Sequence, residues 1–185
     1  MKVPQARKFI QDQINQTNHI VKRNVWGHRT PKYNNLVQDW LYDSVVIHHS
    51  GNSGKTDPLE IESHHMVHNN YDDVGYHYMV HPNGKIYEGR EIIYKGSHVR
   101  LLNSRKIGIL MMGDFDEQWW DIDDTLSDAH INTLNSLIKT LKSKFNLTKL
   151  GGHKEFITGQ GYTCPGNLIM SKMDGLRTFH GLSKP

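Results

Sequence analysis

The run Val45-Val46-Ile47-His48-His49-Ser50-Gly51 is the feature that most constrains how this chain can fold. Three consecutive β-branched residues predict a buried strand, and the polar residues that follow mark its end. The end of a strand is where a rigid scaffold can present polar side chains to a cleft. We therefore expect these two histidines to border a functional site.

A second polar cluster lies far downstream, where His153 is followed eleven positions later by Cys164, the only cysteine. His48, His153 and Cys164 would supply three protein ligands and leave a fourth position for water, which is typical of a catalytic zinc. The alternative is chance, because the chain has 13 histidines and a lone cysteine usually behaves as a small buried hydrophobe. Spacing alone leaves both interpretations open.

The composition excludes several classes of protein. A chain of 185 residues is long enough for one domain with its own core. Its 22 basic and 19 acidic residues include no dense basic run, which argues against nucleic acid as a partner. No apolar run reaches the roughly 18 residues of a membrane span, so we expect no membrane insertion. A single cysteine allows no internal disulfide, and the first residues do not resemble a signal peptide, so we expect synthesis in the cytoplasm.

The pattern of apolar residues predicts an α/β fold in a single domain, with a central, mostly mixed sheet flanked by helices. Strands are expected over residues 44–49, 74–81, 85–89 and 107–113. The second and third should form a hairpin at Asn83-Gly84, and the fourth should be central because it is continuously apolar.

Helices are expected over residues 4–18, 58–70, 125–145 and 167–179. Asp57 is the predicted cap of the second helix, and Thr125 with Asp128 the predicted start of the third. The second helix carries His64, His65 and His68, for which we favour a solvated face or the rim of a cleft over a metal site.

Seven blocks in order resemble a known family. They are Val45 to Ser50, Asp73 to His77, Asn83 to Arg90, Gly96 to His98, Ile107 to Ile109, Gly152-His153 and Thr163 to Gly166. Together they are similar to the zinc N-acetylmuramoyl-L-alanine amidases of the peptidoglycan recognition protein and phage-lysozyme type. Several blocks that agree in order are far more specific than one motif. The resemblance implies an amidase domain over residues 21–180, preceded by a helical extension over residues 1–20.

The resemblance also implies roles for individual residues. His48, His153 and Cys164 would bind one Zn²⁺, with Tyr76 beside the metal as a donor to the developing oxyanion. Thr163 would be a catalytic helper, and the substrate contacts would come from His49, His98, Asn103 and Tyr162. The sequence departs from the family pattern between His153 and Cys164, where the loop is three residues longer and Tyr162 stands where relatives carry a Lys or Thr.

Three functions are compatible with these residues. The first is hydrolysis of the bond between N-acetylmuramic acid and the L-alanine of the stem peptide, by a lysin, a secreted antibacterial effector or a recycling enzyme that reaches the cell wall by a route other than a signal peptide. The second is a module that binds peptidoglycan without cutting it, and Cys164 argues against this function because such modules often lack the cysteine. The third is a zinc-dependent regulator that binds another protein, and an immunity or delivery protein is a further possible partner.

The longer loop yields a first prediction. The segment Gly159-Gln160-Gly161 contributes two glycines to the three extra residues of this loop. Glycine costs backbone entropy on folding, and this cost is justified where a turn or a moving segment needs its conformational freedom. If the loop borders the cleft, deleting residues 159–161 should leave bound zinc unchanged, as elemental analysis would show, and abolish turnover on peptidoglycan. Unchanged zinc with unchanged turnover would identify the loop as a surface insertion without a role.

Overall fold

The computed structural model describes residues 3–51, 56–116, 124–157 and 163–185. Its helices are α1 (Val3–Thr17), α2 (Arg23–Trp26), α3 (Pro58–Ser63), α4 (Asp128–Lys144), α5 (His153–Phe156) and α6 (Asn167–His180), with a 3-10 turn at Tyr33–Asn35 and a π-helical turn at His64–His68. Its strands are β1 (Ser44–His49), β2 (Tyr78–Val80), β3 (Ile86–Glu88), β4 (Lys106–Met111) and β5 (Lys149–Gly152). In the described part of the chain, no helix is long and apolar enough to cross a membrane.

The five strands form one mixed sheet in the order β3-β2-β4-β1-β5. β1 is parallel to both β4 and β5, β2 is parallel to β4, and β2 and β3 form the antiparallel hairpin expected from Asn83-Gly84. This arrangement confirms the predicted fold class, including the central position of the strand that contains Ile107 and Ile109.

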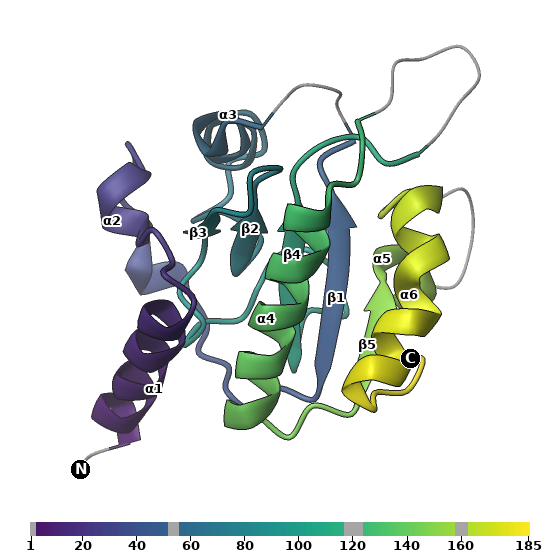
Figure 1. The fold of residues 1–185 in the computed structure, drawn as a ribbon. Coiled ribbons are helices and arrows are strands. Elements are labelled where there is room, and N and C mark those ends of the chain that lie inside the picture. Colours follow the sequence, from purple (N-terminus) through teal and green to yellow (C-terminus); the bar gives the residue numbers. More distant parts are fainter. Residues whose placement is uncertain (1–2, 52–55, 117–123, 158–162) are drawn as a thin grey trace.

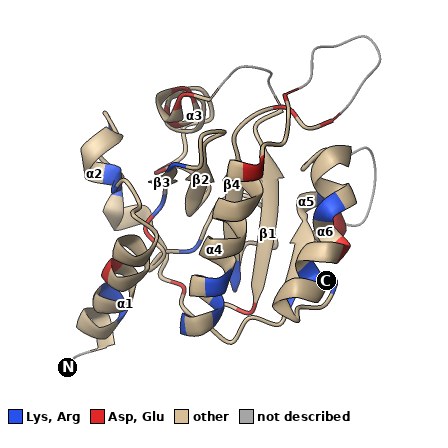
Figure 2. Ribbon diagram, in the orientation of Figure 1, with Lys and Arg blue, Asp and Glu red and all other residues tan. Residues whose placement is uncertain are grey.

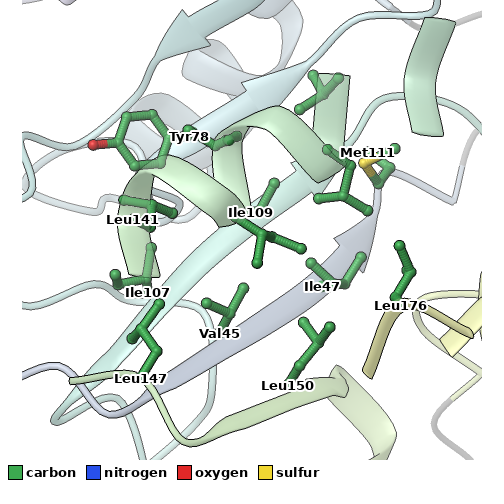
Figure 3. Packing of buried hydrophobic residues seen from close by; sticks show 14 of the residues in the cluster. Val45, Ile47, Tyr78, Ile107, Ile109, Met111, Leu141, Leu147, Leu150 and Leu176 are labelled. Carbon is green, nitrogen blue, oxygen red and sulfur yellow. The ribbon is translucent and has the colours of Figure 1, made fainter. Parts of the chain in front are cut away.

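One face of the sheet carries most of the core. α4 and α6 lie across this face (Figure 1), and successive side chains of a strand point to opposite faces. The cluster on this face combines strand residues with α4 and α6, and Figure 3 shows Val45, Ile47, Ile107, Ile109 and Leu141 within it. The opposite face carries a smaller buried cluster of Val74, Met79, Leu110 and Met112, against which Trp26 of α2 and Ile61 of α3 pack.

α1 belongs to the same packed unit. Ile14 is fully buried in the main cluster, and Gln11 and Asn15 both donate to the buried Glu88 carboxylate of β3, at 2.8 and 2.7 Å. The helix therefore packs against the sheet domain through apolar and polar contacts together.

Local chemistry explains where α3 and α4 begin. Asp57 caps α3 as predicted, because its side chain accepts a hydrogen bond from Leu59 N at 2.9 Å. α4 begins at Asp128 rather than at Thr125, since Ser127 is its cap and accepts from His130 N at 3.2 Å. Figure 2 shows the acidic start and basic end of α4, and both charges suit the helix dipole.

Two predicted elements differ most from their sequence patterns. The helix expected over residues 58–70 is α-helical only to Ser63 and then widens into the π-helical turn His64–His68. The strand expected over residues 74–81 pairs as β2 only from Tyr78 to Val80. Both differences occur where the chain borders the cavities around Tyr76.

Candidate metal centre and groove

His48, His153 and Cys164 come together at the C-terminal edge of the sheet. His48 lies near the end of β1, and His153 directly follows β5, the parallel neighbour whose Gly152 is in register with Ile47. One nitrogen of each histidine and the Cys164 sulfur all lie within 4.8 Å of one another. Cys164 Sγ is 3.6 Å from His48 Nδ1, and the two histidine rings are 4.6 Å apart between centroids.

The turn that carries Cys164 is held on both sides. Lys154 N donates to Cys164 O at 3.0 Å, which ties the turn to α5. On the other side Gly166 has φ +88°, and a Cβ atom there would lie 2.2 Å from Phe115 O. Only glycine allows this approach, so Gly166 fixes the turn against Phe115 at the start of α6.

Burial sets the protonation of the cluster. It lowers the pKa of His48 well below its usual value, with further contributions from His98 and His153, and it also lowers the pKa of His153. Both imidazoles are therefore neutral and able to bind a cation. Burial raises the pKa of the Cys164 thiol to about 12, so a thiolate at this position needs a compensating positive charge.

Tyr76 forms the next part of the site. Its ring lies 5.0 Å from that of His48, between centroids, and burial raises the pKa of its phenol so that it keeps its proton. Tyr76 lines two cavities. One is about 530 Å³ and also bordered by His98, Arg100, Asn103 and His153; the other is about 400 Å³ and bordered by Glu60, His64 and His68. His65 also lines both cavities, so the groove extends on either side of the pair formed by Tyr76 and His65.

Backbone pairing and buried side chains together hold the segment that delivers Tyr76, whose carbonyl oxygen accepts from Arg90 N at 2.8 Å. His65 Nδ1 accepts a hydrogen bond from Gly75 N at 2.9 Å. The Arg90 guanidinium donates to three carbonyl oxygens, those of Asp73 at 3.1 Å, Val74 at 3.0 Å and Lys95 at 2.7 Å. Lys95 begins the segment that leads to His98, so one buried arginine joins the two segments that form this side of the groove.

A second buried arginine supports this arrangement from behind. Arg23 pairs with Glu62 at 2.5 Å and with Asp73 at 3.5 Å, and all three side chains are buried. Burial raises the pKa of Asp73 to about 6, although Arg23 and Arg90 oppose the shift. The ion pairs connect α2, α3 and the segment before Tyr76.

The predicted substrate-contacting residues have different surroundings. His98 is 9 % exposed, and its Nδ1 lies 3.0 Å from His48 Nε2. Asn103 Oδ1 accepts from His98 N and Val99 N, both at 2.7 Å. His49 Nδ1 accepts from Phe115 N at 3.2 Å. Thr163 is exposed beside Cys164, and Tyr162 lies outside the described residues, as does the loop of residues 159–161; the roles of these residues stay predictions.

Sequence reasoning missed the contributions of His65 and Arg90. We expected His65 on a solvated or rim face with His64 and His68, but His65 is buried beside Tyr76 while the other two are exposed. Its only signal in the sequence is its place in a histidine-rich helix, which does not separate a buried ring from exposed ones. Arg90 stood within a resembling block, yet nothing in the sequence indicated that it bonds three carbonyls.

The geometry defines an α/β protein with a His-His-Cys cluster at the edge of its sheet. A family model described as N-acetylmuramoyl-L-alanine amidase matches residues 38–167. The chain therefore belongs to the N-acetylmuramoyl-L-alanine amidase family.

Individual relatives include recognition proteins and enzymes. Peptidoglycan-recognition protein SC2 of Drosophila melanogaster is 26% identical over 163 residues, which are 83% of this chain and 84% of that protein. The endolysin of Escherichia phage T7 is 30% identical over 115 residues, 61% of this chain and 75% of that protein. The solved amidase LysCS of Clostridium intestinale has a TM-score of 0.70 and 27% identity, and the match covers 89% of this chain and 96% of that one.

The role of Arg90 can be tested by Arg90→Lys. A lysine ammonium cannot bond three divergent carbonyls as a guanidinium does, so buried oxygens should lose their donors at a cost of about 2–4 kcal/mol. Urea unfolding measures this loss, and Arg105→Lys, on the exposed surface, is the matched control. A change below about 0.5 kcal/mol, the usual range of surface substitutions, would contradict the role.

Proposed function

We propose that this protein is a zinc-dependent amidase of the bacterial cell wall that hydrolyses the bond between N-acetylmuramic acid and the L-alanine of the stem peptide. The observation that carries the proposal is the His48, His153 and Cys164 cluster, with its ligand atoms within 4.8 Å and Tyr76 alongside. Membership of the amidase family and likeness to an endolysin and to a solved lysin support it.

The cluster fits zinc in its chemistry, and one of its interatomic distances matches a tetrahedral zinc site. Two imidazoles and a thiolate are ligands that Zn²⁺ prefers, and bond lengths of about 2.3 Å to sulfur and about 2.0 Å to nitrogen imply a tetrahedral edge of about 3.5 Å. The Cys164 Sγ to His48 Nδ1 distance of 3.6 Å matches this edge. When bound, zinc supplies a Lewis acid that polarises the scissile carbonyl and activates water.

The chain's own groups then position the substrate and stabilise charge. The cavity beside His153 and Tyr76 is lined by polar side chains, including Arg100 and Asn103, and can receive the amide and its flanking groups. The Tyr76 phenol is a hydrogen-bond donor at the edge of this cavity, where the carbonyl oxygen gains negative charge. Thr163, which precedes Cys164 in the chain, is the candidate helper.

The second candidate function is recognition of peptidoglycan without cleavage. The relative SC2 is named for recognition, and the groove could bind a muropeptide in either case. Cys164 favours catalysis, because a binding module has no need of a buried thiol between two histidines. Release of stem peptide from purified sacculi tests catalysis, and binding to sacculi without release would support the recognition module.

Cys164→Ser tests the metal site. A hydroxyl is a much poorer zinc ligand than a thiolate, so the variant should lose both tight zinc and activity, whereas the wild-type protein should hold one zinc per chain by elemental analysis. The matched control is His64→Ala, which removes an exposed histidine outside the cluster and should keep its zinc. Full zinc in Cys164→Ser would show that the ligand assignment is wrong.

Tyr76→Phe tests the oxyanion donor. Loss of one such donor typically lowers turnover by about a hundredfold, and zinc content should not change, because Tyr76 is not among the ligands. Tyr78→Phe is the control, since that phenol is buried on the other face of the sheet and its loss should leave turnover unchanged. An unchanged rate in Tyr76→Phe would show that the Tyr76 hydroxyl has no catalytic role and that the ring serves only in packing.

A further inference from the structure

A second layer of histidine lies behind the metal cluster. His48 Nε2 is 3.0 Å from His98 Nδ1, and His98 Nε2 is 3.4 Å from Lys106 O. Both rings are buried, at 1% and 9% exposure. His48 and His98 therefore form a short chain that begins at a backbone carbonyl and ends at a metal-facing ring.

When both rings are neutral, the hydrogen bonds that link His48, His98 and Lys106 O can run in only one direction. Lys106 O can only accept, so His98 Nε2 must carry the hydrogen, and His98 Nδ1 is then an acceptor. His48 Nε2 must consequently donate to it, which leaves the lone pair of His48 on Nδ1. That nitrogen is the one that lies 3.6 Å from Cys164 Sγ.

The fold makes specific space for the His98 ring. A Cβ atom at Gly108 of β4 would lie 2.6 Å from His98 Cδ2, and one at Gly96 would lie 2.4 Å from the same atom. Asn103 Oδ1 meanwhile accepts from the backbone N–H groups of His98 and Val99, both at 2.7 Å. The glycines at positions 96 and 108 thus leave the space that the ring fills, and Asn103 holds the backbone that carries it.

We propose that His98 is a positioning residue for the metal centre: it selects the tautomer of His48 and orients Nδ1 toward the ion. This inference rests on the proposed zinc site. Both nitrogens of His98 are engaged within the protein, so its ring can meet substrate in the adjoining cavity only through carbon atoms. A metal-bound histidine is commonly oriented in this way by the hydrogen bond of its other nitrogen.

The first test measures zinc affinity without substrate, by competition with a chromogenic chelator. His98→Leu removes the acceptor, and His98→Gln cannot place one at the Nδ1 position, so both should bind zinc about 10–100-fold more weakly. His98→Asn places an amide oxygen near the Nδ1 position and should stay within about threefold of wild type. Gly108→Ala, which pushes the ring out of its place, should weaken binding as His98→Leu does.

Two controls separate this effect from general destabilisation. Leu137→Ala removes a fully buried side chain of α4 on the other face of the sheet, so it should lower stability and leave zinc affinity unchanged. His64→Ala removes an exposed histidine and should change neither. Wild-type affinity in His98→Leu would overturn the inference, whereas a wild-type protein that binds no zinc would overturn the proposed function itself.

A second test reads the tautomer directly and needs no variant to fold. Long-range ¹H–¹⁵N NMR of the metal-free wild-type protein should show His48 protonated at Nε2 and unprotonated at Nδ1. In His98→Leu, if it folds, this preference should be lost. A wild-type His48 that carries its hydrogen on Nδ1 would overturn the inference whatever the zinc affinities are.

Discussion

The parallel pairing of β1 with β5 is the constraint on which the site depends. His48 and His153 are more than a hundred residues apart in the sequence, yet they are brought together because Ile47 and Gly152 are in register. A shift of one residue in this register would turn His48 to the other face, into the apolar cluster. Because β1 also pairs with β4 along its whole length, with His49 opposite Met111, the register is fixed from both sides.

The side of the groove that carries Tyr76 depends more on buried polar side chains. Its backbone between Asp73 and His77 lies outside the regular strands. Some of its polar groups pair with the backbone of neighbouring segments, and others are satisfied by buried side chains, chiefly Arg90 and His65. Buried charges are costly unless they are paired and fully hydrogen-bonded, and here the guanidinium of Arg90 donates at all three of its nitrogens. One half of the site thus follows from the pairing of regular strands, and the other from a buried polar network combined with irregular backbone pairing.

This division explains how much the sequence could predict. The β-branched run at Val45, the Asn83-Gly84 hairpin and the apolar stripe of α4 are local signals of regular structure, and the structure confirms them. Residue type and spacing proposed the three ligands but left chance open, and the resemblance to the family decided between the two. No local pattern shows that Cys164 would lie 3.6 Å from His48. The π-helical turn, the buried ring of His65 and the short β2 depend on long-range contacts of side chains, which periodicity does not record. The same holds for the cap of α4, where Thr125 and Ser127 are equally good candidates until Ser127 is seen to reach His130 N.

The contacts of α1 bear on where an independently folding fragment can begin. The family match starts at residue 38, but the buried carboxylate of Glu88 takes hydrogen bonds from Gln11, Asn15 and the backbone of Arg23. A fragment cut at the family boundary would lose all three of these donors, and it would also remove Ile14 and Ile20 from the main cluster. The packed unit of the structure therefore extends beyond the residues that the family model matches, and it includes the first helix.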